Sequence, residues 1–90
     1  MMAFEWDENR RERNIRIHQI DFIDAQVLFD GRDTLTYHSP RGEEEQWATT
    51  GLFEGRIITV IWTQRGDNIR IISARRARDN EQRAYRELYG

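Results

Sequence analysis

Residues 56–78, RIITVIWTQRGDNIRIISARRAR, decide the fold of this chain. The segment Arg56–Thr63 is almost continuously apolar, a pattern typical of a strand that is covered on both faces. A polar turn at 65–68 follows, and Ile69–Ala74 returns as a second strand rich in β-formers. We therefore expect two consecutive antiparallel strands that are joined by a tight turn.

Three more strands are expected upstream of this pair. Thr34–His38 and Gln46–Phe53 are rich in β-formers, and Phe4–Trp6 is a short alternating segment near the start of the chain. Glu54 and Gly55 form a hairpin turn that leads into the strand at 56–63. The strands therefore form a meander.

Helices are expected on both sides of the strand region. Asp7 caps a very polar helix at Glu8–His18, and Asp21 caps a second helix that ends at Gly31. Asp79 caps a final helix that carries Tyr85 on its apolar side. The order β-α-α-β-β-β-β-α keeps the helices at the two ends of the chain and predicts the α+β class.

Length and composition exclude several classes of protein. The chain has 90 residues, which is the size of one domain spanning 1–90, and its ten aromatic residues suffice for one small core. No cysteine is present, which excludes disulfides, zinc thiolates and thiol catalysis. The longest apolar run is too short to cross a bilayer, and the acidic N-terminal residues do not resemble a signal peptide. We expect a cytoplasmic protein.

The charge is distributed unevenly along the chain. Residues 1–50 carry six Arg and eleven acidic residues, whereas residues 51–90 carry eight Arg and five acidic residues. Within 65–78, five arginines stand against one acidic residue, Asp67. Such a local cluster favours an anion site although the net charge is −2. All fourteen basic residues are Arg, so lysine-based catalysis is excluded.

The densest functional signal is the segment 70–78. Regular alternation places two sets of side chains on opposite faces of its strand: Arg70, Ile72 and Ala74 on one, and Ile69, Ile71 and Ser73 on the other. Arginine suits a phosphate site because its fork binds two oxygens and does not lose its proton. The alternative, which stays open, is that these arginines pair with the acidic residues of the first half.

Other candidate groups are scattered along the sequence. His18 ends a helix, where the dipole favours the imidazolium, and it is either a proton donor to a leaving oxygen or a surface residue. Glu45 closes an acidic run that is either a source of a general base or a solvated loop. Tyr85 is either a core residue or a phosphate contact. The two histidines are far apart in sequence, so we expect no metal and no cofactor.

Several motifs together resemble the BrnT-type toxins over nearly the whole chain. The most specific part is the block Arg70–Ala77, RIISARRA. The other matching positions are Phe4–Asn9, Asn14, His18, Ile20–Phe22, Ala25, Gly51, Gly55, Arg56, Val60, Thr63, Arg65, Gly66, Glu81 and Tyr85.

This resemblance implies a fold and a function. Such proteins are toxins of type II toxin–antitoxin modules and are similar to RelE/ParE-type proteins. Their two N-terminal helices pack on a four- to five-stranded, mainly antiparallel curved sheet with a C-terminal helix. They are endoribonucleases that cleave RNA without a metal and inhibit translation. A BrnA-type ribbon-helix-helix antitoxin neutralises them, and they reach operator DNA only through that antitoxin.

The resemblance also suggests roles for single residues. Arg70 and Arg75 would bind the phosphate and stabilise transition-state charge. His18 would be the general acid, Glu45 the general base and Tyr85 an auxiliary group. Further arginines would bind the RNA strand: Arg65, Arg76 and Arg78.

Three positions depart from the family pattern. Ile17 replaces a basic residue before His18, Gln19 replaces a helix-ending glycine, and Gln46 replaces a basic residue after Glu45. These losses motivate an alternative, a catalytically weakened BrnT-like protein that acts as an antitoxin- or RNA-binding module. A plain protein-interaction domain is a third possibility. We expect an antitoxin to cover the 65–78 region or the helices beside it with acidic or apolar groups.

Overall fold

The computed structural model describes residues 3–40 and 45–90 of the chain. Strands and helices follow in an α+β order, as predicted. Their bounds are β1 Phe4–Glu5, α1 Glu8–His18, α2 Phe22–Ala25, η1 (a 3₁₀-helix) Gln26–Phe29, β2 Thr34–Ser39, β3 Gln46–Phe53, β4 Arg56–Arg65, β5 Asn68–Arg76 and α3 Asp79–Tyr89. Each strand begins and ends within a few residues of the predicted position. In the described ranges, no helix has both the length and the apolar character to cross a membrane.

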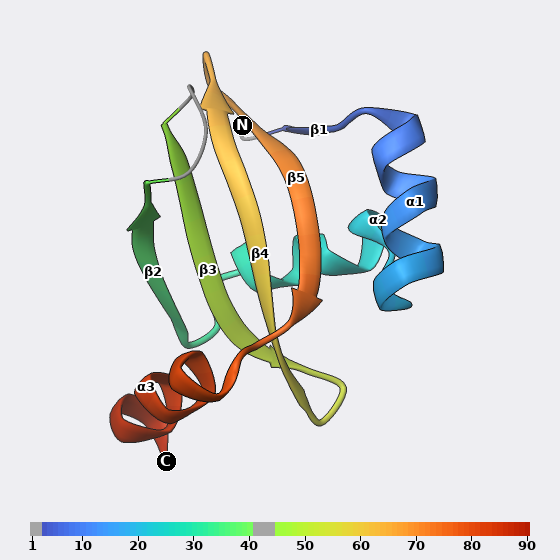
Figure 1. The fold of residues 1–90 in the computed structure, drawn as a ribbon. Helices are drawn as coiled ribbons and strands as arrows, with labels where there is room; N and C mark the ends of the chain where they lie inside the picture. Colours follow the sequence, from blue (N-terminus) through green and yellow to red (C-terminus); the bar gives the residue numbers. More distant parts are fainter. Residues whose placement is uncertain (1–2, 41–44) are drawn as a thin grey trace.

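The strands form one mixed sheet in the order β1-β5-β4-β3-β2 (Figure 1). β1 runs parallel to β5, and the other neighbours are antiparallel. β4 is therefore the central strand of the sheet, and Ile57–Val60 and Thr63 are buried, in agreement with its apolar sequence. The predicted likeness to the RelE fold stays a prediction.

The hydrophobic core lies on one face of the sheet, under α1, α2 and η1. Phe22 and Leu28 pack there against Ile58, Val60 and Ile71, and all five are almost fully buried. Side chains alternate along β4, so Thr59 points to the opposite face. Its hydroxyl donates there to Glu81 of α3 at 3.1 Å. α3 thus covers one end of the second face, as the red helix in Figure 1 shows.

The second helix is shorter than predicted. Asp21 caps it as expected, with its carboxylate accepting the backbone N–H of Ile23 at 3.0 Å, but α2 gives way to η1 after Ala25. The tighter winding of η1 carries Leu28 onto β3 at Gly51, where a Cβ would lie 2.9 Å from Leu28 Cδ2. Gly51 therefore leaves the room that this segment needs to lie close to the sheet.

The prediction that Asp79 caps the last helix is wrong. Arg78 is the N-cap, and Asp79 is the first helical residue. The backbone N–H of Arg78 donates to Glu81 Oε1 at 2.8 Å. The carboxylate of Glu81 thereby satisfies a donor at the helix start, as the acidic residue of a capping box does.

The prediction of regular alternation along β5 fails at a β-bulge. Ile71 is opposite Trp62 and Ser73 is opposite Ile61, so Ile72 is an extra residue without a partner. Beyond the bulge, Ala74 is buried in the core with Ile69 and Ile71 and does not share a face with Arg70. The shift instead turns Arg75 to the face that carries α3.

Candidate functional site

A pocket of about 430 Å³ lies on the face of the sheet that α3 covers in part. Strands β2 to β5 form its floor, and the first turn of α3 forms one wall. The described residues that line it are Tyr37, Ser39, Pro40, Gln46, Ala48, Ile61, Ile72, Ser73, Arg75, Arg78, Asn80 and Glu81. The β-bulge contributes both Ile72 and Ser73 to this floor.

Arg75 is the central cation of this pocket. It lies opposite Thr59 in the sheet, and its side chain is 17% exposed. Its Nη1 and Nη2 atoms donate to the two carboxylate oxygens of Glu81 at 2.7 and 3.0 Å. This two-point hydrogen bond outweighs the burial of the guanidinium and raises the pKa of Arg75. Arg75 is therefore a fixed positive charge that the solvent still reaches.

Glu81 is the buried partner that positions Arg75. Its side chain is 5% exposed and also accepts the hydroxyl protons of Thr59, at 3.1 Å, and of Tyr37. Burial opposes its ionisation, but hydrogen bonds from Arg75, Tyr37 and the Arg78 N–H prevail and lower the pKa to about 2. Glu81 is thus a carboxylate at neutral pH, and it ties α3 to the floor of the pocket.

Tyr37 is a site residue that the sequence analysis missed. It lies on β2 opposite Ala48, is 38% exposed and donates its hydroxyl proton to Glu81. Burial and this hydrogen bond raise the pKa of Tyr37 to about 12. Its hydroxyl therefore stays protonated. A tyrosine in an alternating strand is an ordinary feature, and only the sheet pairing brings it beside Arg75.

Glu81 does not occupy all the hydrogen-bond donors of the Arg75 guanidinium. Glu81 occupies the edge formed by Nη1 and Nη2, and Nε makes no hydrogen bond to any residue within 3–40 or 45–90. Arg75 lines the pocket, and its Nε–H is available to an anion without loss of the two hydrogen bonds to Glu81. This geometry suits a phosphodiester, because two oxygens of one phosphate match two N–H groups of an arginine.

The other predicted catalytic residues lie outside this pocket. Arg70 donates to Glu5 at 2.9 Å near the far end of β5. His18 ends α1, in the layer on the opposite face of the sheet. Glu45 has an exposed side chain, and its backbone carbonyl accepts the hydroxyl proton of Thr63 at 2.7 Å. Tyr85 lines a different pocket, behind α3. The structure therefore groups only Arg75 of these five at the pocket.

The predicted RNA-binding arginines also separate. Arg78 lines the pocket beside Arg75, whereas Arg76 lies on the far side of α3. Arg65 ends β4, where its charge helps to lower the pKa of Glu5 after the hydrogen bonds from Asn68 and Arg70. Some arginines of 65–78 are thus paired with acidic residues, as the open alternative expected, and others face solvent.

Two departures from the family pattern have visible consequences. Gln19 takes the left-handed conformation expected of glycine, with φ of 57°, and its N–H donates to the Ile15 carbonyl at 2.9 Å. The helix end is therefore kept without glycine. Gln46 lines the pocket, so a neutral side chain stands where the resemblance led us to expect a cation. Glu43 and Glu44 of the acidic run lie outside the described residues.

The sequence matches one family model, described as "Ribonuclease toxin, BrnT, of type II toxin-antitoxin system", over residues 6–81. The chain belongs to the BrnT family. No curated protein matches the sequence. The matched range contains the whole sheet except β1, together with Arg75 and its partner Glu81. Among the described residues, no group of three or more histidine and acidic side chains is placed to hold a metal ion.

Proposed function

We propose that this BrnT chain is a metal-independent endoribonuclease that cleaves RNA in the Arg75 pocket and thereby inhibits translation. One observation carries this proposal: a guanidinium fixed by a buried carboxylate lines a solvent-accessible pocket. A preorganised cation of this kind stabilises charge that develops on a phosphate without having to reorganise.

Strand cleavage without a metal has three needs. The ribose 2′-oxygen must lose its proton, the charge on the phosphorane must be stabilised, and the 5′-oxygen must gain a proton. Arg75 meets the second need, and Arg78 holds the strand beside it. Tyr37 is a neutral donor within the same pocket.

The roles of the remaining predicted residues are also proposals, and each can be tested by a single substitution. His18 as general acid, Glu45 as general base, and Arg70 and Tyr85 as charge or hydrogen-bond donors each require the RNA to reach beyond the pocket. Arg65 and Arg76 would bind flanking parts of the strand. The partner is a BrnA-type antitoxin with a DNA-binding domain, and the site of action is the cytoplasm.

The test is cleavage of a labelled RNA by the purified chain, with and without EDTA. We expect equal rates in both, and a loss of about 100-fold in kcat for Arg75→Lys. This variant keeps a positive charge opposite Glu81 but loses the planar fork, so the protein should still fold. The matched control is Arg10→Lys, because Arg10 is an exposed residue of α1.

Each outcome bears on the proposal. A rate unchanged by Arg75→Lys removes Arg75 from the site, and a rate abolished by EDTA contradicts metal independence. RNA that binds to the chain without being cut favours the weakened, binding-only protein that Gln46 and Ile17 suggest. Thermal unfolding of each variant separates a loss of chemistry from a loss of structure.

A further inference from the structure

A second pocket, of about 260 Å³, lies between α3 and the turn that joins β3 to β4. Its lining is of two kinds. The apolar part comes from Leu52, Tyr85 and Tyr89, and the charged part comes from Arg56, Arg76 and Arg86. No acidic residue belongs to the described lining of this pocket. We call it the α3–hairpin pocket.

The charge of this pocket is not neutralised within the described ranges of the chain. Arg11, Arg70 and Arg75 each have a carboxylate partner at 2.9 Å or less. In contrast, none of the three arginines of the α3–hairpin pocket forms an ion pair with a residue of 3–40 or 45–90. Like charges gathered without partners attract an acidic ligand.

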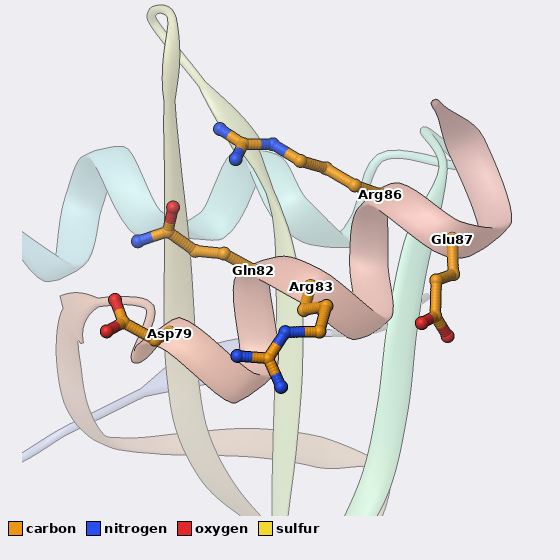
Figure 2. A pocket seen from close by; sticks show the side chains of 5 residues that line it. All are labelled: Asp79, Gln82, Arg83, Arg86 and Glu87. Carbon is orange, nitrogen blue, oxygen red and sulfur yellow. The ribbon is translucent and has the colours of Figure 1, made fainter.

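The apolar part of the pocket is exposed. Leu52 is 45% and Tyr89 is 42% exposed, and the rings of Tyr85 and Tyr89 pack at 5.0 Å between centroids. Figure 2 shows Gln82 and Arg86 reaching to one side of α3, whereas Arg83 reaches to the other. Arg86 lines the α3–hairpin pocket together with Tyr85 and Tyr89. Tyrosine and arginine around a small apolar recess are the residues that dominate binding energy at protein interfaces.

We propose that the α3–hairpin pocket binds an acidic segment of a protein partner, with one apolar side chain of that segment inserted between Leu52 and the tyrosines. The partner is the antitoxin, so this inference rests on the proposed function. The pocket is separate from the Arg75 pocket, because α3 lies between them: Arg78, Asn80 and Glu81 line one, and Tyr85, Arg86 and Tyr89 line the other.

A peptide fits this pocket better than RNA does. Its volume is below the roughly 300 Å³ at which pockets for whole small ligands begin, so it holds a side chain rather than a nucleotide. Exposed leucine also gains nothing from a phosphate backbone, whereas an apolar anchor of a peptide buries it.

The test measures binding of the antitoxin, purified as the product of the reading frame next to this gene, to charge-reversal variants. We expect Arg56→Glu/Arg86→Glu to weaken binding at least 30-fold and to leave RNA cleavage by the free toxin within twofold. The matched control is Arg10→Glu/Arg13→Glu, which reverses two exposed arginines of α1, a helix that contributes no residue to this pocket. The single variant Arg86→Glu serves if the double variant unfolds.

A second arm identifies the segment and its chemistry. Overlapping 15-residue peptides of the antitoxin are titrated against the wild-type chain, and the binding peptide should contain acidic residues around an apolar one. Replacing its acidic residues with Lys should restore binding to Arg56→Glu/Arg86→Glu. The proposal would be overturned if Arg56→Glu/Arg86→Glu bound the unmodified antitoxin with wild-type affinity. It would also be overturned if only a basic peptide of the antitoxin bound to the wild-type chain.

The outcomes also separate this inference from the proposed function. If the pocket variant keeps the antitoxin but loses affinity for RNA, the occupant is RNA and the inference is wrong. If the wild-type chain cuts no RNA while the pocket variant still loses the antitoxin, the inference stands and the proposed activity fails.

Discussion

Replacing Glu81 with glutamine should destabilise the protein by about 3 kcal/mol at neutral pH. The carboxylate is 5% exposed and accepts hydrogen bonds from both Nη atoms of Arg75. The amide of the Glu81→Gln variant would offer one acceptor and two donors, so the guanidinium would stay buried opposite an NH₂ group. Breaking a buried ion pair by removing one partner costs about 3–5 kcal/mol.

The pKa of Glu81 leads to a similar magnitude independently. A fall from the ordinary value of 4.5 to about 2 corresponds to about 3 kcal/mol of folding free energy. Because the folded pKa is the lower one, this contribution is complete above about pH 5 and is lost as the pH falls toward 2. The difference between the wild type and Glu81→Gln should therefore shrink across that window.

The assay is urea and thermal unfolding followed by far-UV circular dichroism. For a chain of 90 residues, a loss of about 3 kcal/mol lowers the Tm by about 12–24 °C. The control is Glu87→Gln, which changes an exposed carboxylate of the same helix and should cost less than about 0.5 kcal/mol. A Glu81→Gln variant within about 1 kcal/mol of the wild type, or a difference that stays constant from about pH 7 to pH 2, would refute the reasoning.

Further predictions concern the polar contacts around the sheet. In an absorbance titration at 295 nm, Tyr37→Phe should remove the tyrosine that ionises near pH 12. The raised pKa of Tyr37 stabilises the wild type below about pH 10, and this contribution should decline between about pH 10 and 12. A titration curve that Tyr37→Phe leaves unchanged would contradict the Tyr37–Glu81 contact. Asn14→Ala should cost about 2–3 kcal/mol in urea unfolding, because the Asn14 side chain donates to the carbonyls of Ile20 and Ala74 at 2.8 Å and accepts the Ala74 N–H at 3.1 Å. The control is Asn9→Ala, at an exposed position of the same helix. Equal urea midpoints for the two variants would contradict a stabilising role of the Asn14 hydrogen bonds.

The sequence predicts most of the fold because the strands are defined by local patterns. The apolar segment within β4 and the turns around it leave few alternatives for the sheet, and Asp7 and Asp21 cap their helices as expected. The bulge at Ile72 is not visible in the sequence, because two isoleucines in a row fit a regular strand equally well. The close approach of Leu28 in η1 to Gly51 joins two residues that are distant in sequence, so a local pattern does not show it either.

The candidate site is less predictable than the fold, because it depends on contacts between distant elements. Arg75 stands out in the sequence as part of an arginine cluster, but its face is decided by the bulge. Glu81 reads as an ordinary acidic residue in the first turn of a helix, and its burial follows from where α3 docks. Tyr37 reaches the site through the pairing of β2 with β3. Pairing and docking are tertiary events that a local pattern does not encode.

The unpaired residue in β5 lets this strand carry one residue more than its neighbour without changing the faces of the side chains that follow. A chain that lacks Ile72 would pair continuously with β4, and Ser73 would still lie opposite Ile61 and Arg75 opposite Thr59. Arg75 would therefore stay on the face that carries α3, and the pocket would lose one apolar residue of its floor. The loss or gain of one codon at this position is thus a change of strand length that such a toxin can tolerate without moving its central cation.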